Sequence, residues 1–168
     1  MLLRSLVVYY SKTGNTKWAA QTIAAEVGAD AEELAELKKR PGVVGFLKGV
    51  SSHWANYQTQ IAPTTRSPGD YDLVIIGTPV WGGKPTPAIT VYLKNADLAG
   101  MKVALFFTQD SKKPQAIEEA KALIPNSMYL GSLSLVNPLN DKEACEKQIM
   151  EWCAKLNSHS SPSAATFL

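Results

Sequence analysis

The chain predicts an α/β protein: a doubly wound parallel β-sheet with helices on both of its faces. Three observations support this fold class. Short apolar runs rich in β-branched residues alternate with segments of helical periodicity. The run at residues 73–76 is apolar without interruption, as expected of a central strand that is buried on both faces. A length of 168 residues with 45% hydrophobic content suffices for one domain with a substantial core.

Five strands are expected, in alternation with helices. The first strand is expected over residues 5–10 and the first helix over 15–27, with Gly28 as its stop. The second strand, over 31–37, is the least clear, because its glutamates also favour helix; an edge strand can carry such residues. The other strands are expected over 72–77, 102–107 and 129–135, and the other helices over 87–94, 114–122 and 141–156.

A long connection, residues 38–70, separates the second and third strands. Connections of this length are often functional. An apolar stretch at 43–54 favours a helix, and Trp54 and Tyr57 either pack the connection onto the sheet or contact a ligand. His53 has no evident partner and is expected at the surface.

Domain and compartment follow from composition. We expect one domain over residues 1–156 and a mobile tail rich in Ser and Ala over 157–168. Cys145 and Cys153 fall eight residues apart in one expected helix, too far to form a disulfide, which favours reduced thiols and the cytoplasm. No leader, membrane span or metal site is expected, and a net charge of +2 gives no argument for nucleic-acid binding.

The loop at residues 11–16, Ser-Lys-Thr-Gly-Asn-Thr, joins the first strand to the first helix. Backbone N–H groups at a helix N-terminus attract anions, and three hydroxyls add donors. Gly14 allows close approach of the backbone. One of these hydroxyls could serve as an ordinary N-cap, but three exceed what one cap needs. The loop therefore predicts a phosphate site.

Two further loops should meet this one, because ligands of doubly wound sheets bind beyond the carboxyl ends of the strands. The loop at 78–84 offers Trp81 beside two glycines, and the loop at 108–113 offers short polar groups. Together the three loops suit a phosphorylated ligand with a large planar ring. The alternative for Trp81 is an ordinary buried tryptophan.

These motifs resemble those of flavodoxins. Residues 11–16 match the family's phosphate loop, Thr/Ser-x-Thr-Gly-x-Thr. Residues 72–81, Asp-Leu-Val-Ile-Ile-Gly-Thr-Pro-Val-Trp, match the family's third strand and first ring-binding loop. The similarity covers most of the chain and thins at 38–70 and in the tail. It implies a flavodoxin-like fold with strand order 2-1-3-4-5, and FMN held without a covalent bond.

The resemblance also implies roles for individual residues. The phosphate would be bound by Ser11, Lys12, Thr13, Gly14, Asn15 and Thr16. Thr78 and Pro79 would line the ribityl chain. The ring would be flanked by Val80, Trp81, Gly82 and Gly83, with Thr108, Gln109 and Asp110 at its other edge. No catalytic acid or base is required, because the flavin carries the electrons.

The implied function is electron transfer at low potential through the flavin semiquinone. The alternative is an FMN-dependent NAD(P)H:quinone or nitro reductase, and a flavin-free interaction module is a third hypothesis. The loop at 108–114 lacks the aromatic residue that stacks on the second ring face in many flavodoxins, and Lys84, Lys112 and Lys113 make a basic rim; both features favour the enzyme. The compact size and the Trp-Gly-Gly loop favour the carrier.

The expected partners are redox proteins, a reductase donor and an acceptor enzyme, or a small quinone-like acceptor. A sequence pI of about 8.5 favours an acidic partner, since flavodoxins are usually acidic around the flavin. Nucleic acid and membrane are not expected as partners. The chain is expected to be a monomer or a weak dimer.

Overall fold

The computed structural model of the chain describes residues 3–37 and 59–158. The expected helix at 43–54 and Tyr57 lie outside the described residues, as do residues 159–168 of the expected tail.

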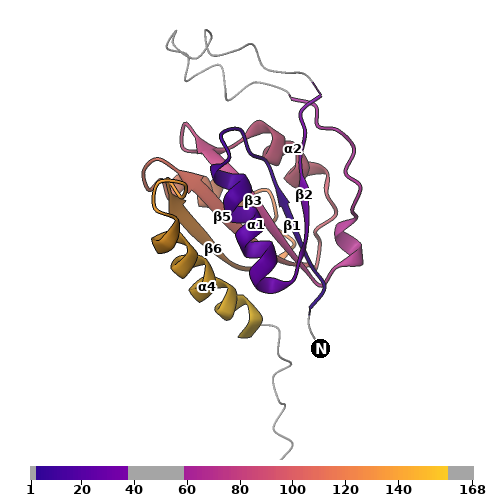
Figure 1. The fold of residues 1–168 in the computed structure, drawn as a ribbon. Coiled ribbons are helices and arrows are strands. Elements are labelled where there is room, and N and C mark those ends of the chain that lie inside the picture. The colour runs from indigo at the N-terminus through magenta and orange to yellow at the C-terminus, as the bar shows by residue number, and fades with distance from the viewer. Residues whose placement is uncertain (1–2, 38–58, 159–168) are drawn as a thin grey trace, which may run out of the picture.

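A single twisted sheet forms the centre of the fold (Figure 1). Its strands follow the order β2-β1-β3-β5-β6, and neighbours in this order are parallel. The strands are β1 (Ser5–Tyr9), β2 (Asp30–Glu33), β3 (Leu73–Trp81), β5 (Lys102–Gln109) and β6 (Met128–Val136). A two-residue strand, β4 (Lys84–Pro85), pairs antiparallel with β3. Apart from β4, the predicted order and the flavodoxin-like fold class are confirmed.

Helices cover both faces of the sheet (Figure 1). They are α1 (Asn15–Val27), α2 (Pro87–Asn95), α3 (Gln115–Lys121) and α4 (Lys142–Ser158), and a short 3-10 turn, η3, spans Pro68–Asp70. Alternate residues of β1 divide between two cores: Leu6 and Val8 pack with α2 and α3, whereas Val7 and Tyr9 pack with α1 and α4. None of the helices described is long and apolar enough to cross a lipid bilayer.

The four predicted helices within the described residues lie where expected, and α1 has the predicted bounds. Gly28 ends α1 in a left-handed conformation, with φ 65°. Cys145 and Cys153 both lie in α4, buried and free, so the expected absence of a disulfide between them is confirmed.

The second strand is shorter than predicted and ends at Glu33. Beyond it the chain pairs with the segment that returns from the long connection. The N–H of Leu37 donates to the carbonyl of Gln60, and the N–H of Ala62 donates to the carbonyl of Ala35, each at 2.8 Å. This pairing is antiparallel. Leu34 still donates to the carbonyl of Tyr9 in β1, but residues 35–37 leave the parallel ladder that the sequence pattern predicted for them.

The segment predicted as a loop after the third strand is a tight β-hairpin, which corrects that prediction. Strand β3 continues to Trp81, which pairs with Lys84 across the turn. Gly82 and Gly83 have φ of 58° and 78°. Two successive positive φ values are characteristic of the type I′ turn that joins two-residue hairpins, and glycine adopts them without strain.

Two glycines inside strands mark points of special geometry. Gly77 in β3 lies against the ring of Phe106 in β5, so closely that a Cβ atom would overlap the ring. Gly131 in β6 has φ of 126° and follows an irregularity in the ladder, where Val103 pairs with Tyr129 but Ala104 pairs with Gly131. The extra residue makes a bulge in the outer strand.

Candidate functional site

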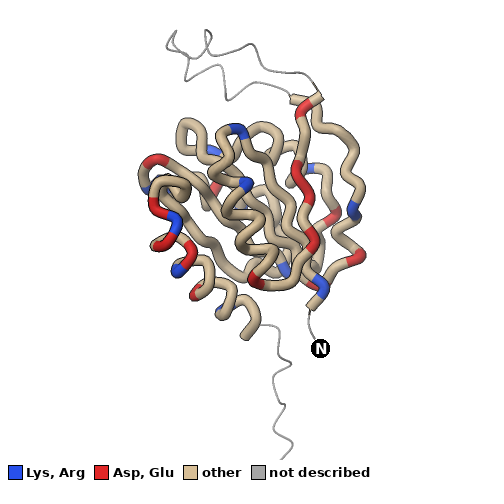
Figure 2. The backbone as a smooth tube through the Cα atoms, in the orientation of Figure 1, with Lys and Arg blue, Asp and Glu red and all other residues tan. Residues whose placement is uncertain are grey.

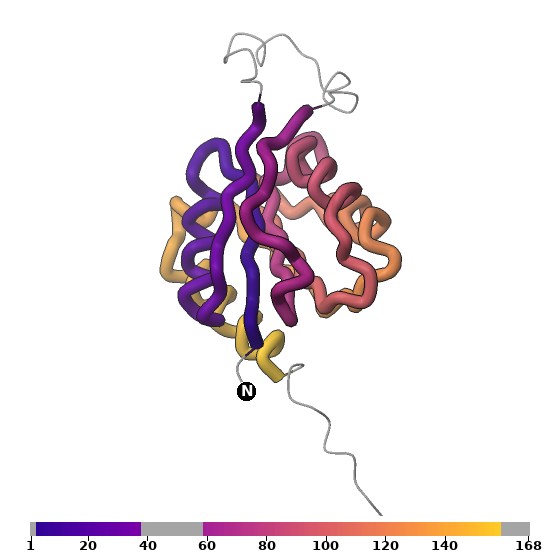
Figure 3. Tube along the Cα trace, turned by 90° about the vertical axis from the view of Figure 1, so that its right-hand side faces the viewer, coloured from indigo at the N-terminus to yellow at the C-terminus, as the bar shows by residue number. Residues whose placement is uncertain are grey.

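The three predicted loops lie at one end of the sheet. In the parallel register Tyr9 pairs with Gly77, and Pro79 pairs with Thr108, so β1, β3 and β5 end side by side. The turn between β1 and α1 lies at this end, which is opposite the N-terminus (Figure 3). The structure therefore brings the loops at 11–16, 78–84 and 108–113 to one end of the sheet, as a doubly wound sheet requires.

The loop at 11–16 leaves several backbone donors without an acceptor. Gly14 is the N-cap residue of α1 in a left-handed conformation, with φ 94°, and no side chain caps the helix there. The N–H of Lys17 donates to Ser11 Oγ at 3.1 Å, and the N–H of Trp18 donates to the carbonyl of Gly14 at 2.9 Å. Within the described part of the chain, the N–H groups of residues 13–16 have no acceptor.

These four N–H groups are what an anion site needs. They lie at the positive end of the α1 dipole, and unpaired amides at a helix N-terminus bind phosphate and carboxylate readily. Of the three hydroxyls, that of Ser11 accepts from the N–H of Lys17 in the first turn of α1, so it meets part of the capping alternative, whereas Thr13 and Thr16 do not cap the helix. Thr13 Oγ1 accepts from Asn15 Nδ2 at 3.2 Å instead.

A fourth segment, the loop that follows β6, supports this site and was missed in the sequence analysis. The N–H of Leu139 donates to Asn15 Oδ1 at 3.1 Å. A Cβ atom on Gly14 would lie 3.6 Å from Leu139 Cδ1. The sequence does carry a signal for it, because Asn137 and Asn140 flank a turn that follows a strand of the same parallel sheet.

The Trp81 indole lies beside the first loop. Its ring centroid is 5.9 Å from that of Tyr10, with an interplanar angle of 87°, and Lys12 Nζ is 5.8 Å from it. Trp81 is half-buried and packs against the core beneath α2 and α3, so it is not an ordinary fully buried tryptophan. Lys12, predicted at the phosphate, extends over the indole.

Val80 and Thr78 of the second loop are buried. Val80, predicted to flank a ring, has its side chain buried in the core with only 8% exposed. Thr78 Oγ1 donates to the carbonyl of Pro79 at 2.8 Å and accepts from the N–H of Thr86 at 3.0 Å. The hydroxyl predicted to line the ribityl chain therefore holds the base of the hairpin together.

The third loop combines a buried amide with exposed charges. Gln109 is buried, and its Oε1 accepts from the N–H of Lys113 at 3.1 Å. Lys113 Nζ lies 3.0 Å from Asp110 Oδ1, and hydrogen bonds from Lys113 and Ser111 hold the pKa of Asp110 below its usual value. Thr108 is buried and bonded to Thr16, so it lies beneath the phosphate loop and not at an open edge.

Cations and anions pair around the rim of this end. Lys17 Nζ lies 2.9 Å from Glu33, and Lys84 Nζ lies 3.7 Å from Glu119. Tyr9 donates to Glu33 at 3.3 Å; burial, and then the Glu33 charge, raise the pKa of Tyr9 to about 12. Both ion pairs are exposed and contribute little to stability, about 0–1 kcal/mol each.

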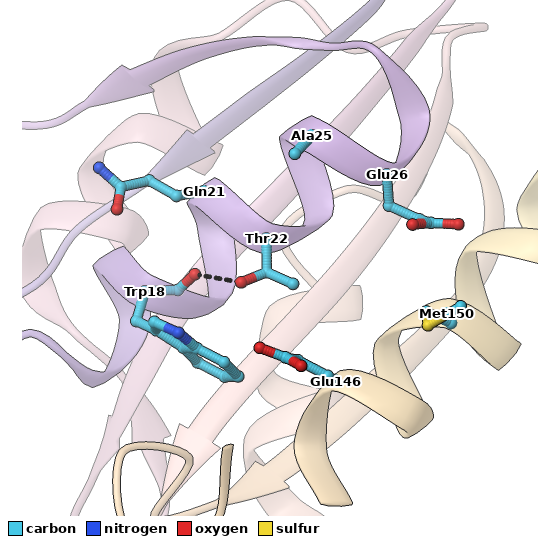
Figure 4. A pocket seen from close by; sticks show the side chains of 7 residues that line it. All are labelled: Trp18, Gln21, Thr22, Ala25, Glu26, Glu146 and Met150. Carbon is cyan, nitrogen blue, oxygen red and sulfur yellow. Dashed lines mark hydrogen bonds between the residues drawn. The ribbon is translucent and has the colours of Figure 1, made fainter. Parts of the chain in front are cut away.

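A groove of about 520 Å³ lies elsewhere, on the surface between α1 and α4 (Figure 4). It is lined by Trp18, Gln21, Thr22, Ala25, Glu26, Glu146 and Met150. Two carboxylates line it, which disfavours phosphate. It does not include any of the residues predicted to bind a ligand, and the described chain contains no cluster of side chains fit to hold a metal ion.

Comparison with known proteins supports the resemblance. A flavodoxin of Maridesulfovibrio salexigens is 28% identical over 156 residues, which are 89% of this chain and 93% of that protein. A crystal structure of a candidate flavoprotein from Bacteroides eggerthii has a TM-score of 0.77 and 25% identity, covering 90% of this chain and 96% of the other. No protein-family model matches the chain.

Two more distant structures share the fold. A flavoprotein of Lactobacillus acidophilus, crystallised in complex with FMN, has a TM-score of 0.67 at 22% identity and covers 82% of this chain and 97% of its own. Two-electron reduced flavodoxin from Megasphaera elsdenii has a TM-score of 0.59 at 19% identity, with coverages of 90% and 99%. The resemblance of this chain to flavodoxins is thus confirmed.

Proposed function

We propose that this chain binds FMN and transfers electrons as a flavodoxin does. The observation that carries the proposal is the set of four unpaired amides at residues 13–16, beside the half-buried indole of Trp81. An anion cradle and an aromatic plane at the same sheet edge fit a ligand that is both phosphorylated and aromatic. The relatives named as flavodoxins add support at the level of the family.

The residues present fit FMN. The amides of residues 13–16 and the hydroxyl of Ser11 would hold its phosphate, which carries negative charge toward the helix dipole. Trp81, with the turn at Gly82 and Gly83, would flank the ring. When bound, FMN supplies the electron-transfer chemistry, and the protein binds it, orients it and sets its electrostatic surroundings.

The test is titration of the purified protein with FMN, followed by calorimetry and by quenching of flavin fluorescence. Gly14 and Gly28 offer a matched pair of variants, because both terminate α1 with positive φ. Gly14→Ala should weaken FMN binding, since the strained residue lies in the cradle. Gly28→Ala places the same strain at the other end of the helix and should leave binding unchanged. A wild-type protein that ignores FMN would refute the proposal.

A reductase that uses NAD(P)H is the second candidate, favoured by one feature. The described loop at 110–114 brings no aromatic side chain to the site, which is consistent with room for a second substrate on the ring. Stopped-flow mixing with NADPH separates the two functions. Fast direct reduction with two-electron turnover of a quinone indicates the enzyme, whereas no NADPH oxidation and a stable one-electron-reduced form indicate the carrier.

For partners we propose an acidic redox protein or a small quinone-like acceptor. Positions of positive and negative residues alternate along the backbone, with both signs present in several elements (Figure 2). At the candidate site, however, Lys12 and Lys112 are exposed beside the paired Lys84 and Lys113. Electron transfer to an acidic partner should slow as ionic strength rises, because salt screens the attraction.

The buried thiols of Cys145 and Cys153, which are not joined in a disulfide, favour the cytoplasm as the compartment. We further propose one domain and a monomer or weak dimer in solution. Light scattering measures that state directly.

A further inference from the structure

Two buried threonine hydroxyls join the first loop to the third. Thr16, in the first turn of α1, and Thr108, near the end of β5, have their Oγ1 atoms 2.7 Å apart. The residues are 92 positions apart in sequence and only 1% and 4% exposed. This is a short hydrogen bond, sealed from solvent, in which either hydroxyl can be the donor.

One of the two hydroxyl hydrogens of this pair has no acceptor among the described residues. Each hydroxyl carries one hydrogen, and the bond between them uses only one of the two. In the part of the chain that the structure describes, neither Thr16 Oγ1 nor Thr108 Oγ1 has another partner. Buried donors in native proteins nearly always have an acceptor. One acceptor is therefore missing from the protein itself.

In a second threonine pair of the same protein, both hydroxyl hydrogens have acceptors. Thr78 Oγ1 donates to the carbonyl of Pro79 at 2.8 Å and accepts from the N–H of Thr86 at 3.0 Å. Because the Thr78 hydrogen is used, the contact of 3.2 Å between the two hydroxyls has Thr86 as its donor. Both hydroxyl hydrogens of this pair have acceptors within the protein, so no ligand is needed.

The surroundings of Thr16 indicate the chemistry of the missing acceptor. Thr16 belongs to the group of residues 13–16 whose backbone N–H groups also have no acceptor in the described chain. Four amides and one hydroxyl hydrogen thus belong to neighbouring residues at a helix N-terminus, and all of them favour a group that only accepts and carries negative charge. A phosphate has these properties.

We propose that Thr108 is a positioning residue for phosphate recognition. Its hydroxyl donates to Thr16 Oγ1, which leaves the Thr16 hydrogen to be donated to the phosphate. A hydroxyl that accepts a hydrogen bond becomes a stronger donor, so Thr108 strengthens the contact without touching the anion. This inference rests on the proposed binding of FMN, and it extends the phosphate site to a residue of the third loop.

The experiment compares two ligands that differ only in the phosphate. FMN and riboflavin are titrated into wild type, Thr108→Val, Thr108→Ser and Thr86→Val, with calorimetry as the readout. Thr108→Val keeps the shape of the side chain but removes the donor, and Thr108→Ser restores it. Thr86→Val is the matched control, because it removes a buried threonine hydroxyl from the complete pair. Circular dichroism checks folding, and Thr108→Ala replaces Thr108→Val where the latter does not fold.

Thr108→Val should weaken FMN binding by up to about tenfold, the effect of losing the neutral hydrogen bond that orients and polarises the Thr16 hydroxyl, and leave riboflavin binding unchanged. Thr108→Ser should bind FMN as wild type does, and Thr86→Val should leave the ratio of the two affinities unchanged. Equal loss of both ligands in Thr108→Val, or no loss of FMN, overturns the inference. Wild type that binds neither ligand refutes the proposed function instead, and wild type with equal affinity for both refutes the phosphate site.

Discussion

The rings of Tyr10 and Trp81 meet edge to face, with centroids 5.9 Å apart and planes at 87°. Tyr10 follows β1 directly and also donates its hydroxyl to Glu36 at 3.1 Å. The indole expected at the flavin is therefore in contact with the residue that precedes the phosphate loop. This contact joins the two halves of the candidate site through one aromatic pair.

Replacing Tyr10 should disturb the indole. Edge-to-face pairs contribute about 0.5–1.5 kcal/mol beyond the area they bury. Tyr10→Leu loses the ring contact and should weaken FMN binding by a corresponding amount, whereas Tyr10→Phe keeps the ring and should bind FMN nearly as wild type does. Quenching of flavin fluorescence measures both constants. Equal affinities of the Leu and Phe variants would show that the pair does not position Trp81.

The Gly82–Gly83 turn should affect the flavin potentials more than flavin affinity. Gly82 has φ of 58° with open space around it, so a side chain meets no clash but must adopt a left-handed backbone. Valine adopts that backbone poorly and asparagine adopts it well. Gly82→Val should narrow the gap between the two one-electron midpoint potentials of bound FMN, and Gly82→Asn should not. Potentiometric titration measures the difference between the two potentials. The prediction is contradicted if Gly82→Val weakens FMN binding as much as it destabilises the one-electron-reduced form.

Gly77 should not tolerate any side chain. An added Cβ would overlap the ring of Phe106, which is fully buried in the neighbouring strand. Gly77→Ala should destabilise the fold by about 1–3 kcal/mol or more, as overpacking does, and the added substitution Phe106→Leu should recover part of the loss. Gly69→Ala is the control, because its nearest contact would be Ser67 Oγ at 3.8 Å. Urea denaturation gives the free energies of unfolding.

Tyr92 carries a buried hydroxyl that has no hydrogen-bond partner among the described residues. Burial, with a smaller contribution from Glu32, raises the pKa of Tyr92 well above its ordinary value. Tyr92→Phe removes an unsatisfied group and should leave the free energy of unfolding unchanged or raise it by about 1–3 kcal/mol. Tyr9→Phe removes a hydroxyl that does have a partner, Glu33, and should lower it. Loss of stability in Tyr92→Phe would indicate a partner for its hydroxyl.

Cys153 should make stability fall at alkaline pH. Burial, and then the charge of Glu26, raise the pKa of this thiol from 9.0 to about 12. The folded state therefore holds a proton that the unfolded state releases, so the contribution is complete below pH 9 and is lost as pH rises from about 9 to about 12. Tyr9, whose pKa is also raised to about 12, acts in the same direction.

Urea denaturation of wild type and Cys153→Ala between pH 8 and pH 10.5 checks this effect. The wild-type free energy of unfolding should fall more steeply with pH, because the alanine variant has no thiol at this position. Parallel curves for the two proteins would contradict it. In the folded state at pH 8, Cys153 should also react slowly with a disulfide reagent, since it is fully buried.

Most of the sheet could be predicted from sequence because its strands are short apolar runs with clear ends. The second strand was too long in the prediction, since pairing of residues 35–37 with a segment more than twenty positions away leaves no local signal. The hairpin after β3 was predicted as a loop, although Gly82 and Gly83 between two strand-forming residues are a known sign of a type I′ turn.

The candidate site was predicted as far as its loops, but not in its detail. The sequence shows that residues 11–16 carry three hydroxyls, yet it does not show that Thr16 pairs with Thr108. It placed Val80 beside a ring, whereas the side chain is buried in the core. Whether a side chain is buried or faces a ligand depends on which face of its strand meets the helices, and a shift of one residue reverses that face. The assignment of ligand atoms to residues stays a prediction.

The bulge at Gly131 has a consequence for encounters between copies of this chain. Strand β6 borders the sheet, and a straight, unpaired border is the usual template on which foreign strands add. The extra residue before Gly131 bends that border and breaks its regular ladder of donors and acceptors. The bulge at Gly131 thus disfavours edge-to-edge aggregation through β6, the edge strand farthest from β2.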